Sequence, residues 1–151
     1  PSLGGYPNAQ LDAAVRNSIA SGVTYAVAAG NDGLPAALYS PADVPEALTV
    51  GATDRTDARA SFSNFGSAVD VFAPGVSITS DSYASDTAKA TLSGTSMATP
   101  HVTGTAALYL ADRPGATPAQ VSRAIAALAV PGKVSGRGLG SPDELLQVPP
   151  S

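Results

Sequence analysis

The run from Val23 to Ala29 constrains the fold of this chain more than any other feature. It carries no charged side chain and is followed at once by the turn formers Gly30-Asn31-Asp32-Gly33. A strand without polar alternation is typical of a parallel sheet, in which both faces are covered. Residues 47–52 and 69–72 are also mainly apolar, with Asp70 as their one charged side chain, and predict two further strands. Ligands bind at the carboxyl ends of such strands, which draws attention to the turn that follows Ala29.

Helical patterns alternate with these predicted strands. Residues 9–21 place apolar side chains at helical spacing, with Asn8 as the N-cap and Gly22 just beyond the last turn. A second helix is predicted over 96–110, and Thr117-Pro118 opens a third. The alternation of helices with buried strands indicates an α/β fold with a parallel sheet.

The rest of the chain has weaker signals. Short strands are expected at 76–80 and 90–92, and irregular coil is expected from Gly132 onward. Only three strands are strongly apolar, whereas a covered parallel sheet normally has more. We therefore expect the chain to form one part of a larger sheet.

Composition excludes several classes of function. The chain has 151 residues, a net charge of −4 and no cysteine or tryptophan. It lacks the basic patch and the aromatic platform that nucleic acids require, and it has no thiolate metal site. No stretch approaches 18 consecutive apolar residues and residues 1–151 show no signal-peptide pattern, so a membrane is not expected as a partner. Nucleic acid is not expected either, because the basic patch and the aromatic platform are missing.

The stretch Leu92–His101 contains a glycine and two hydroxyl residues directly before a helical run. We expect Thr95 or Ser96 to cap this helix. A serine at a helix N-terminus faces the positive end of the helix dipole, where an oxyanion is stabilised. From residue types alone, a capped and buried helix without chemistry remains open.

The string Gly94-Thr95-Ser96-Met97-Ala98-Thr99-Pro100-His101-Val102-Thr103-Gly104 resembles the nucleophile segment of the subtilisin-like serine proteases. By that resemblance Ser96 attacks the scissile carbonyl. Thr103 stands where the family commonly has an alanine. The string Val27-Ala28-Ala29-Gly30-Asn31 resembles the oxyanion segment of the same family, which implies that the amide of Asn31 stabilises the tetrahedral intermediate. A turn asparagine is the structural alternative at this position.

The same resemblance implies a substrate site. Ser2, Leu3, Gly4 and Gly5 match the extended edge that pairs with the substrate backbone. Together with Ala28, Ala29 and Gly30 they are expected to form the walls of a roomy, apolar pocket for the side chain that precedes the cleaved bond. These small walls predict broad specificity.

A structural calcium ion is the one cofactor that the resemblance suggests, and none is expected for catalysis. The segments 39–45 and 61–66 resemble the proteinase K branch, in which two backbone carbonyls and one aspartate hold calcium. The matching positions are Pro45, Ala47 and Asp70. Oxygen ligands suit this cation, although Asp70 alone also fits a solvated aspartate at a strand end.

The catalytic base is not expected within residues 1–151. His101 is the only histidine, and at five positions after Ser96 on one helix it points away from that serine. In the family, the triad aspartate and histidine precede the oxyanion asparagine. The resemblance thus implies the C-terminal half of a subtilisin-like fold, with the N-terminal half of the domain and a polypeptide substrate as its partners.

Two hypotheses follow for the function. The first is a secreted serine endopeptidase whose isolated 151-residue segment is inactive because its base is missing. The alternative is a fragment or pseudoprotease module that binds extended peptides without hydrolysis. Secretion rests on the resemblance alone.

Overall fold

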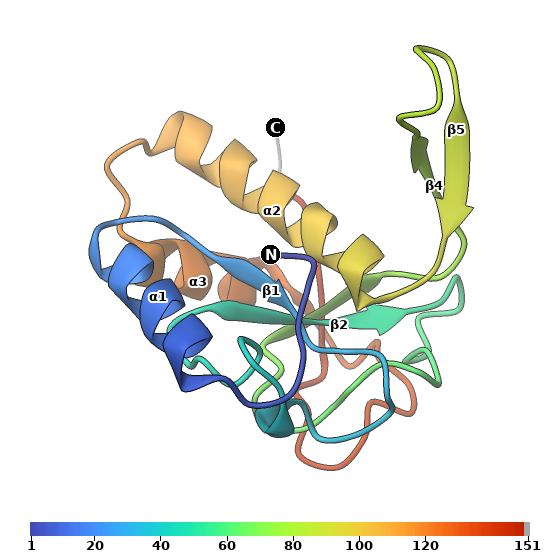
Figure 1. Cartoon of the computed structure of the whole chain (residues 1–151), viewed down its shortest axis with the longest axis horizontal. Helices are drawn as coiled ribbons and strands as arrows, with labels where there is room; N and C mark the ends of the chain where they lie inside the picture. Colours follow the sequence, from blue (N-terminus) through green and yellow to red (C-terminus); the bar gives the residue numbers. More distant parts are fainter. Residues whose placement is uncertain (150–151) are drawn as a thin grey trace.

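The computed structural model describes residues 1–149, and its centre is a five-stranded sheet in the order β1-β2-β3-β7-β6 (Figure 1). The first four of these strands run parallel, and the edge strand β6 runs antiparallel to β7. The strands are β1 (Ala26–Ala28), β2 (Leu48–Thr53), β3 (Val71–Pro74), β7 (Glu144–Leu145) and β6 (Val130–Pro131). The predicted α/β class with a parallel sheet is confirmed.

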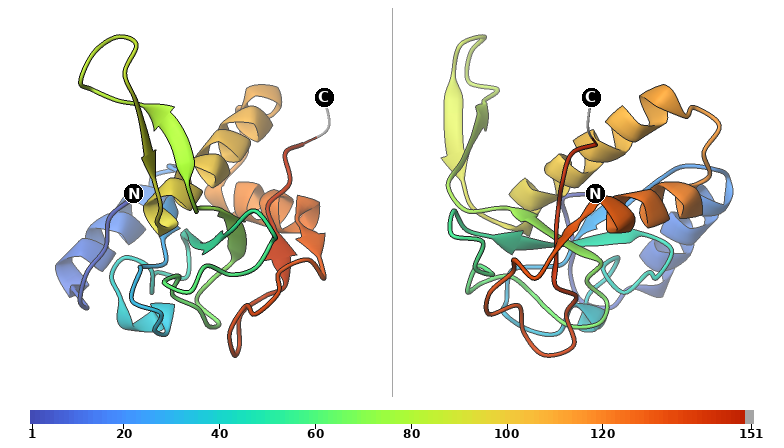
Figure 2. Two further views of the ribbon diagram at one scale, coloured as in Figure 1. Left: turned by 90° about the vertical axis from the view of Figure 1, so that its right-hand side faces the viewer. Right: turned by 180° about the vertical axis from the view of Figure 1, so that it is seen from behind.

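Helices cover the sheet (Figures 1 and 2). Helices α2 (Thr95–Asp112) and α3 (Pro118–Leu128) pack on one face, and α1 (Ala9–Ala20) contributes to the cover of the other. A short 3-10 helix, η1 (Ala36–Leu38), lies in the long connection between β1 and β2. The result is a layered structure in which the carboxyl ends of β1 and β2 open toward the start of α2.

The alternation of side chains along the strands explains these layers. In β2, Leu48, Val50 and Ala52 all point toward α2 and α3, where Val102 and Ile125 meet them. Burial of a larger aliphatic side chain such as Leu48, Val50 or Ile125 contributes about 1.5–3 kcal/mol. In β1, Val27 points the opposite way and packs against α1. Both faces of the sheet are therefore shielded from solvent, as the unbroken apolar runs predict.

The three long predicted helices form with boundaries close to those expected. Asn8 caps α1, since its side chain accepts a hydrogen bond from the N–H of Leu11. Thr117 caps α3 in a reciprocal pair with Gln120. The cap of α2 differs from the prediction, because Gly94 occupies the N-cap and makes no side-chain cap bond.

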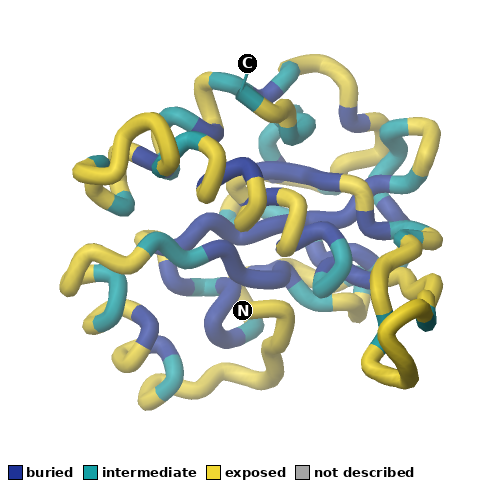
Figure 3. Tube along the Cα trace, turned by 90° about the horizontal axis from the view of Figure 1, so that it is seen from above, coloured by how far each residue is buried: buried dark blue, intermediate teal, exposed yellow. Residues whose placement is uncertain are grey.

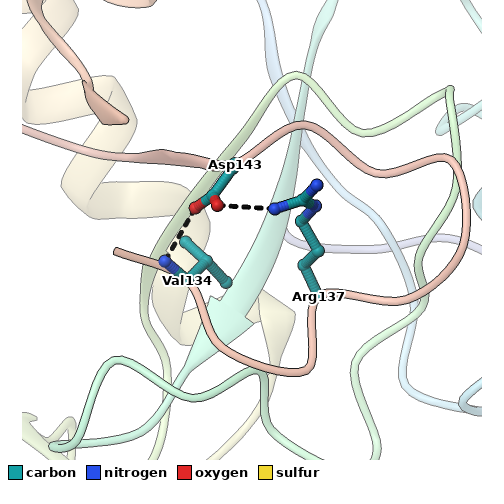
Figure 4. Close-up of polar contacts among 3 residues, drawn as sticks. All are labelled: Val134, Arg137 and Asp143. Atoms are coloured by element: carbon teal, nitrogen blue, oxygen red, sulfur yellow. Dashed lines mark hydrogen bonds and ion pairs between the residues drawn. The ribbon is translucent and has the colours of Figure 1, made fainter. Parts of the chain in front are cut away.

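The C-terminal tail is more ordered than predicted. Instead of forming only irregular coil, it contributes β7, which inserts between β3 and β6. The N–H of Leu146 donates to the carbonyl of Phe72 over 2.8 Å. Asp143 closes the preceding loop, as Figure 4 shows, by accepting from the N–H of Val134 and pairing with Arg137. The strands of the tail could not be predicted from the sequence, because a strand of two residues is too short to show a periodic pattern.

A hairpin projects from this body. Strands β4 (Ile78–Asp81) and β5 (Lys89–Leu92) pair antiparallel, and most of their residues are exposed, so the hairpin is yellow at the right of Figure 3. The hairpin leads directly into α2 and so borders the candidate site. Within residues 1–149, no helix has the length and apolar character needed to cross a membrane.

Candidate active site

Ser96 lies in the first turn of α2, at the carboxyl-end edge of the sheet. Its Oγ donates a hydrogen bond to the carbonyl oxygen of Ser2 over 2.8 Å. Among the described residues, no backbone carbonyl accepts from the N–H of Ser96, which is one of the free donors of a helix N-terminus. The serine therefore presents both a hydroxyl and an unused N–H at the surface of the molecule.

Asn31 takes the place of the missing side-chain cap of α2. Its Oδ1 accepts from the backbone N–H of Thr95 over 2.8 Å and from the Thr95 hydroxyl over 2.9 Å. The Thr95 hydroxyl in turn accepts from the N–H of Gly30 over 3.2 Å. Since these two donors occupy Oδ1, the Nδ2 group of Asn31 is the free end of the amide. The two motifs singled out in the sequence thus meet through Thr95, the residue before Ser96.

A cavity of about 340 Å³ lies beside this contact. Asn31 and Ser96 line it, together with five of the seven residues expected at the substrate site: Leu3, Gly4, Gly5, Ala28 and Gly30. The same cavity is lined by Thr95, Asp32 and Tyr39, which the sequence did not identify as site residues.

The additional residues make this cavity more polar than expected. Burial raises the pKa of Tyr39, and the nearby Asp32 carboxylate adds to the effect. Within residues 1–149, no cationic side chain pairs with Asp32. The expected walls of small apolar residues are therefore joined by a carboxylate and a phenol. Its position directly after Asn31 in the turn is the only feature of the sequence that could have identified Asp32 as a site residue.

The remaining two predicted substrate residues do not line the cavity. Ser2 contributes the carbonyl that accepts from Ser96. Ala29 is fully buried in a cluster with Phe72, and its carbonyl oxygen accepts from Asn64 Nδ2 over 2.8 Å. Side chains alternate along the end of β1, which explains why Ala28 faces the cavity and Ala29 does not, whereas Gly30 lines the cavity with its backbone.

The first five residues form an extended border of this cavity. Gly5 and Ser40 exchange two backbone hydrogen bonds of 3.0 Å each, and the N–H of Ala28 donates to the carbonyl of Pro1 over 3.1 Å. These contacts hold the segment alongside the end of β1. Space at Gly4 is tight, because a Cβ there would lie 3.2 Å from the Ser40 carbonyl oxygen and would require a small shift of the neighbouring backbone.

His101 is directed toward its own helix. Its Nδ1 lies 2.9 Å from the carbonyl oxygen of Met97, and none of the hydrogen bonds among residues 1–149 joins it to Ser96. It lines a second cavity, of about 470 Å³, between α2 and the hairpin. Ser96 sits between the two cavities, since it lines both.

The three candidate calcium ligands lie near the start of β2. Asp70 Oδ2 accepts from the N–H of Thr49 over 2.7 Å, two residues from Ala47. Asp70 as a residue is exposed, but partial desolvation of its carboxyl raises the pKa of that group to about 6, and neither ion pair of the described chain involves it. No backbone N–H in residues 1–149 donates to the carbonyl oxygens of Pro45 or Ala47. One carboxylate and two carbonyl oxygens near the start of β2 are the kind of oxygen ligands that a hard cation prefers.

Comparison with known proteins agrees with this geometry. The model of the subtilase family matches residues 2–141. An extracellular serine proteinase of Thermus sp. is 59% identical over 148 residues, which cover 98% of this chain and 36% of that protein. Alkaline serine exoprotease A of Vibrio alginolyticus is 52% identical over 145 residues, which cover 96% of this chain and 27% of that protein.

A solved structure gives the same answer for the fold. The crystal structure of a cold adapted subtilisin-like serine proteinase superposes with a TM-score of 0.95 at 48% identity, covering 99% of this chain and 54% of that one. The chain thus spans about a third of the curated relatives and about half of the solved catalytic structure. By sequence, fold and the meeting of its two motifs, this chain belongs to the subtilase family.

Proposed function

We propose that this chain is the nucleophile-bearing part of a serine endopeptidase, with Ser96 as the nucleophile and Asn31 in the oxyanion hole. One observation carries the proposal: Thr95 occupies Oδ1 of Asn31, so that Nδ2 of Asn31 and the N–H of Ser96 remain as donors beside the Ser96 hydroxyl. Two donors of this kind are what a tetrahedral oxyanion requires.

The reaction follows from these groups. Ser96 Oγ attacks the carbonyl carbon of a peptide bond while its proton passes to a general base. The C=O electron pair moves onto the oxygen, which the N–H of Ser96 and Nδ2 of Asn31 stabilise. The C–N bond then breaks, the amine leaves with the proton, and an acyl-enzyme remains. Water attacks this ester in the same way and restores the serine.

The base is proposed to come from the part of the catalytic domain that precedes this chain in its relatives. Within residues 1–149, the hydroxyl of Ser96 donates only to a backbone carbonyl, which does not take up a proton at neutral pH. His101 is engaged with Met97. The 151-residue chain alone is therefore expected not to turn over peptides.

The substrate is proposed to be a polypeptide that lies extended along residues 2–5, with a side chain in the cavity beside Asn31. Backbone pairing of this kind recognises any extended peptide, and the cavity selects among side chains. Export from the cell is proposed because the Thermus relative is named an extracellular proteinase.

Labelling with a serine-directed fluorophosphonate tests this function. The chain is compared alone and joined to the preceding half of the Thermus catalytic domain, with Ser96→Ala as the control. Labelling of Ser96 only in the joined protein is the expected result. Stoichiometric labelling of the chain alone would place the base within it, and a joined, folded protein that binds peptides without labelling would support the non-catalytic peptide-binding module instead.

A structural calcium ion is also proposed, held by the carbonyls of Pro45 and Ala47 and by the Asp70 carboxylate. It would compensate a carboxylate that the described chain leaves without a cation. Binding to the folded state alone at 100 times the dissociation constant adds about 2.7 kcal/mol. Millimolar calcium should therefore raise the Tm over that in chelator, and Asp70→Asn should abolish the difference. An equal calcium effect in both proteins would contradict the site.

A further inference from the structure

The most completely hydrogen-bonded buried side chain outside the proposed machinery is Asn64. It lies in the turn before β3, 33 positions after Asn31 in the sequence, and is fully buried. Its amide reaches from one face of the site into the loop of residues 29–34, which carries Asn31. No step of the proposed reaction uses it.

Asn64 contacts this loop on both sides of Asn31. Its Nδ2 donates to the carbonyl of Ala29 over 2.8 Å, and its Oδ1 accepts from the N–H groups of Asp32 and Leu34, both over 3.0 Å. Its own N–H donates to the carbonyl of Gly30 over 3.0 Å. The contacts therefore bracket Asn31 without touching it.

The backbone of the loop is shaped to this amide. Gly30 has φ +105°, and a Cβ at that position would lie 2.2 Å from Asn64 Nδ2. A buried amide with both lone pairs and a donor in use has one position and one orientation. Asn64 and Gly30 thus fix the path of the chain immediately before Asn31.

The loop has two anchors with different tasks. On the helix side, Thr95 holds the side chain of Asn31 through Oδ1. On the sheet side, Asn64 holds the backbone from which that side chain extends. An oxyanion donor acts over hydrogen-bond distance, and displacement of a reacting group by about 1 Å costs as much as about 100-fold in rate.

We propose that Asn64 is a positioning residue that sets the amide of Asn31 against the oxyanion. The proposal rests on the function proposed above. It predicts that Asn64 affects catalysis through Asn31 and not through the stability of the fold alone.

The test is a double-mutant cycle in the joined catalytic domain, with kcat and KM measured on a peptide anilide. Asn64→Asp keeps the size and the acceptor but places an oxygen against the Ala29 carbonyl. We expect kcat to fall about 10- to 100-fold, with KM changed by less than about threefold. In the Asn31→Ala background, Asn64→Asp should lower kcat no further, since its effect is routed through the missing amide.

A control separates positioning from loss of stability. Thr105 is equally buried, and its hydroxyl donates to the carbonyl of His101 within α2. Thr105→Val should lower the Tm and leave kcat unchanged. If Asn64→Asp does not fold, Asn64→Ser, which keeps a short hydroxyl, enters the same cycle below its Tm.

The outcomes distinguish the two proposals. If Asn31→Ala keeps full kcat, the oxyanion role proposed for Asn31 fails. If Asn31→Ala is impaired, but Asn64→Asp is fully active or lowers kcat equally in both backgrounds, the positioning role of Asn64 is overturned and the oxyanion role stands.

Discussion

Two buried polar side chains lie beneath the borders of the candidate cleft, and their hydrogen-bonding needs are met to different degrees. Asn64, under the 29–34 loop, uses both ends of its amide. Asp12, in α1 under the segment that borders residues 2–5, uses one oxygen only. Its Oδ2 accepts from the Ser40 hydroxyl over 2.9 Å, whereas its Oδ1 has no partner among residues 1–149.

A second acid makes the contrast sharper. Asp43 also has a buried oxygen without a partner in the described chain, and it faces Asp12. Burial and the negative charge of Asp12 raise the pKa of Asp43. One proton held between these carboxyls would supply both oxygens with a hydrogen bond. The neutral amide holds its border without a titrating group, whereas we expect the other border to depend on the protonation of the acid pair.

Gly30→Ala should produce the largest effect, because it disrupts the hydrogen bonds of the buried Asn64 amide. The added Cβ collides with Asn64 Nδ2 at a backbone φ of +105°. Left-handed strain and disruption of a buried amide each cost about 1–2 kcal/mol or more, so we expect a loss of about 3 kcal/mol in unfolding free energy. Urea unfolding of the folded chain measures it.

A matched variant isolates the contribution of the amide. Gly22 has φ +103°, nearly that of Gly30, but a Cβ there meets no atom within 4 Å. Gly22→Ala should therefore cost only the backbone strain, about 1 kcal/mol. Equal losses in the two variants would mean that the contact with Asn64 contributes nothing.

This contrast also shows what could be predicted from the sequence. Unbroken apolar runs gave β1 and β2, and helical spacing gave α1 and α3, because each pattern is local. The neighbourhood of Ser96 and Asn31 followed from family resemblance. The bonds of Asn64 and the capping of α2 by Asn31 were missed, since they join segments at least 30 residues apart and leave no periodic trace.

Asp43→Asn should produce an intermediate, pH-dependent effect. Because the folded-state pKa of Asp43 is raised, the folded chain binds more protons than the unfolded chain between the two pKa values. The stability that protonated Asp43 provides is therefore present below about pH 4 and is lost as the pH rises through the folded-state pKa. Asparagine donates to Asp12 at any pH.

The measurement is a pair of melting curves. At pH 7, Asp43→Asn should melt about 2–4 °C above the wild type, a gain that corresponds to about 1 kcal/mol for a chain of this size. At pH 4 the difference should largely vanish. The control Asp86→Asn, on the exposed hairpin loop, should show no such trend. A constant difference at both pH values would refute the shared proton.

The smallest effect is expected from the ion pair beside these acids. Arg16 Nε lies 3.5 Å from Glu46 Oε2, and the two side chains are 45% and 50% exposed. Such a pair contributes about 0.2–1 kcal/mol at most. Arg16 also lowers the pKa of Asp43, a role that Glu46 does not share. Glu46→Gln should therefore cost little at any pH, whereas Arg16→Met should cost more at pH 7 than at pH 4.

A second substitution identifies why Arg16→Met costs more stability at pH 7 than at pH 4. If it arises from the charge that Arg16 presents to Asp43, it should disappear in the Asp43→Asn background, since no ionisable group then remains at that position. If it persists there, the charge of Arg16 acts on another acid, such as its ion-pair partner Glu46, because packing of an aliphatic stem does not depend on pH. Thermal melts of the four proteins at two pH values decide between these origins. The answer shows whether the charge of the half-exposed Arg16 stabilises the Asp12–Asp43 pair, or whether that pair, like Asn64, interacts only with the groups buried around it.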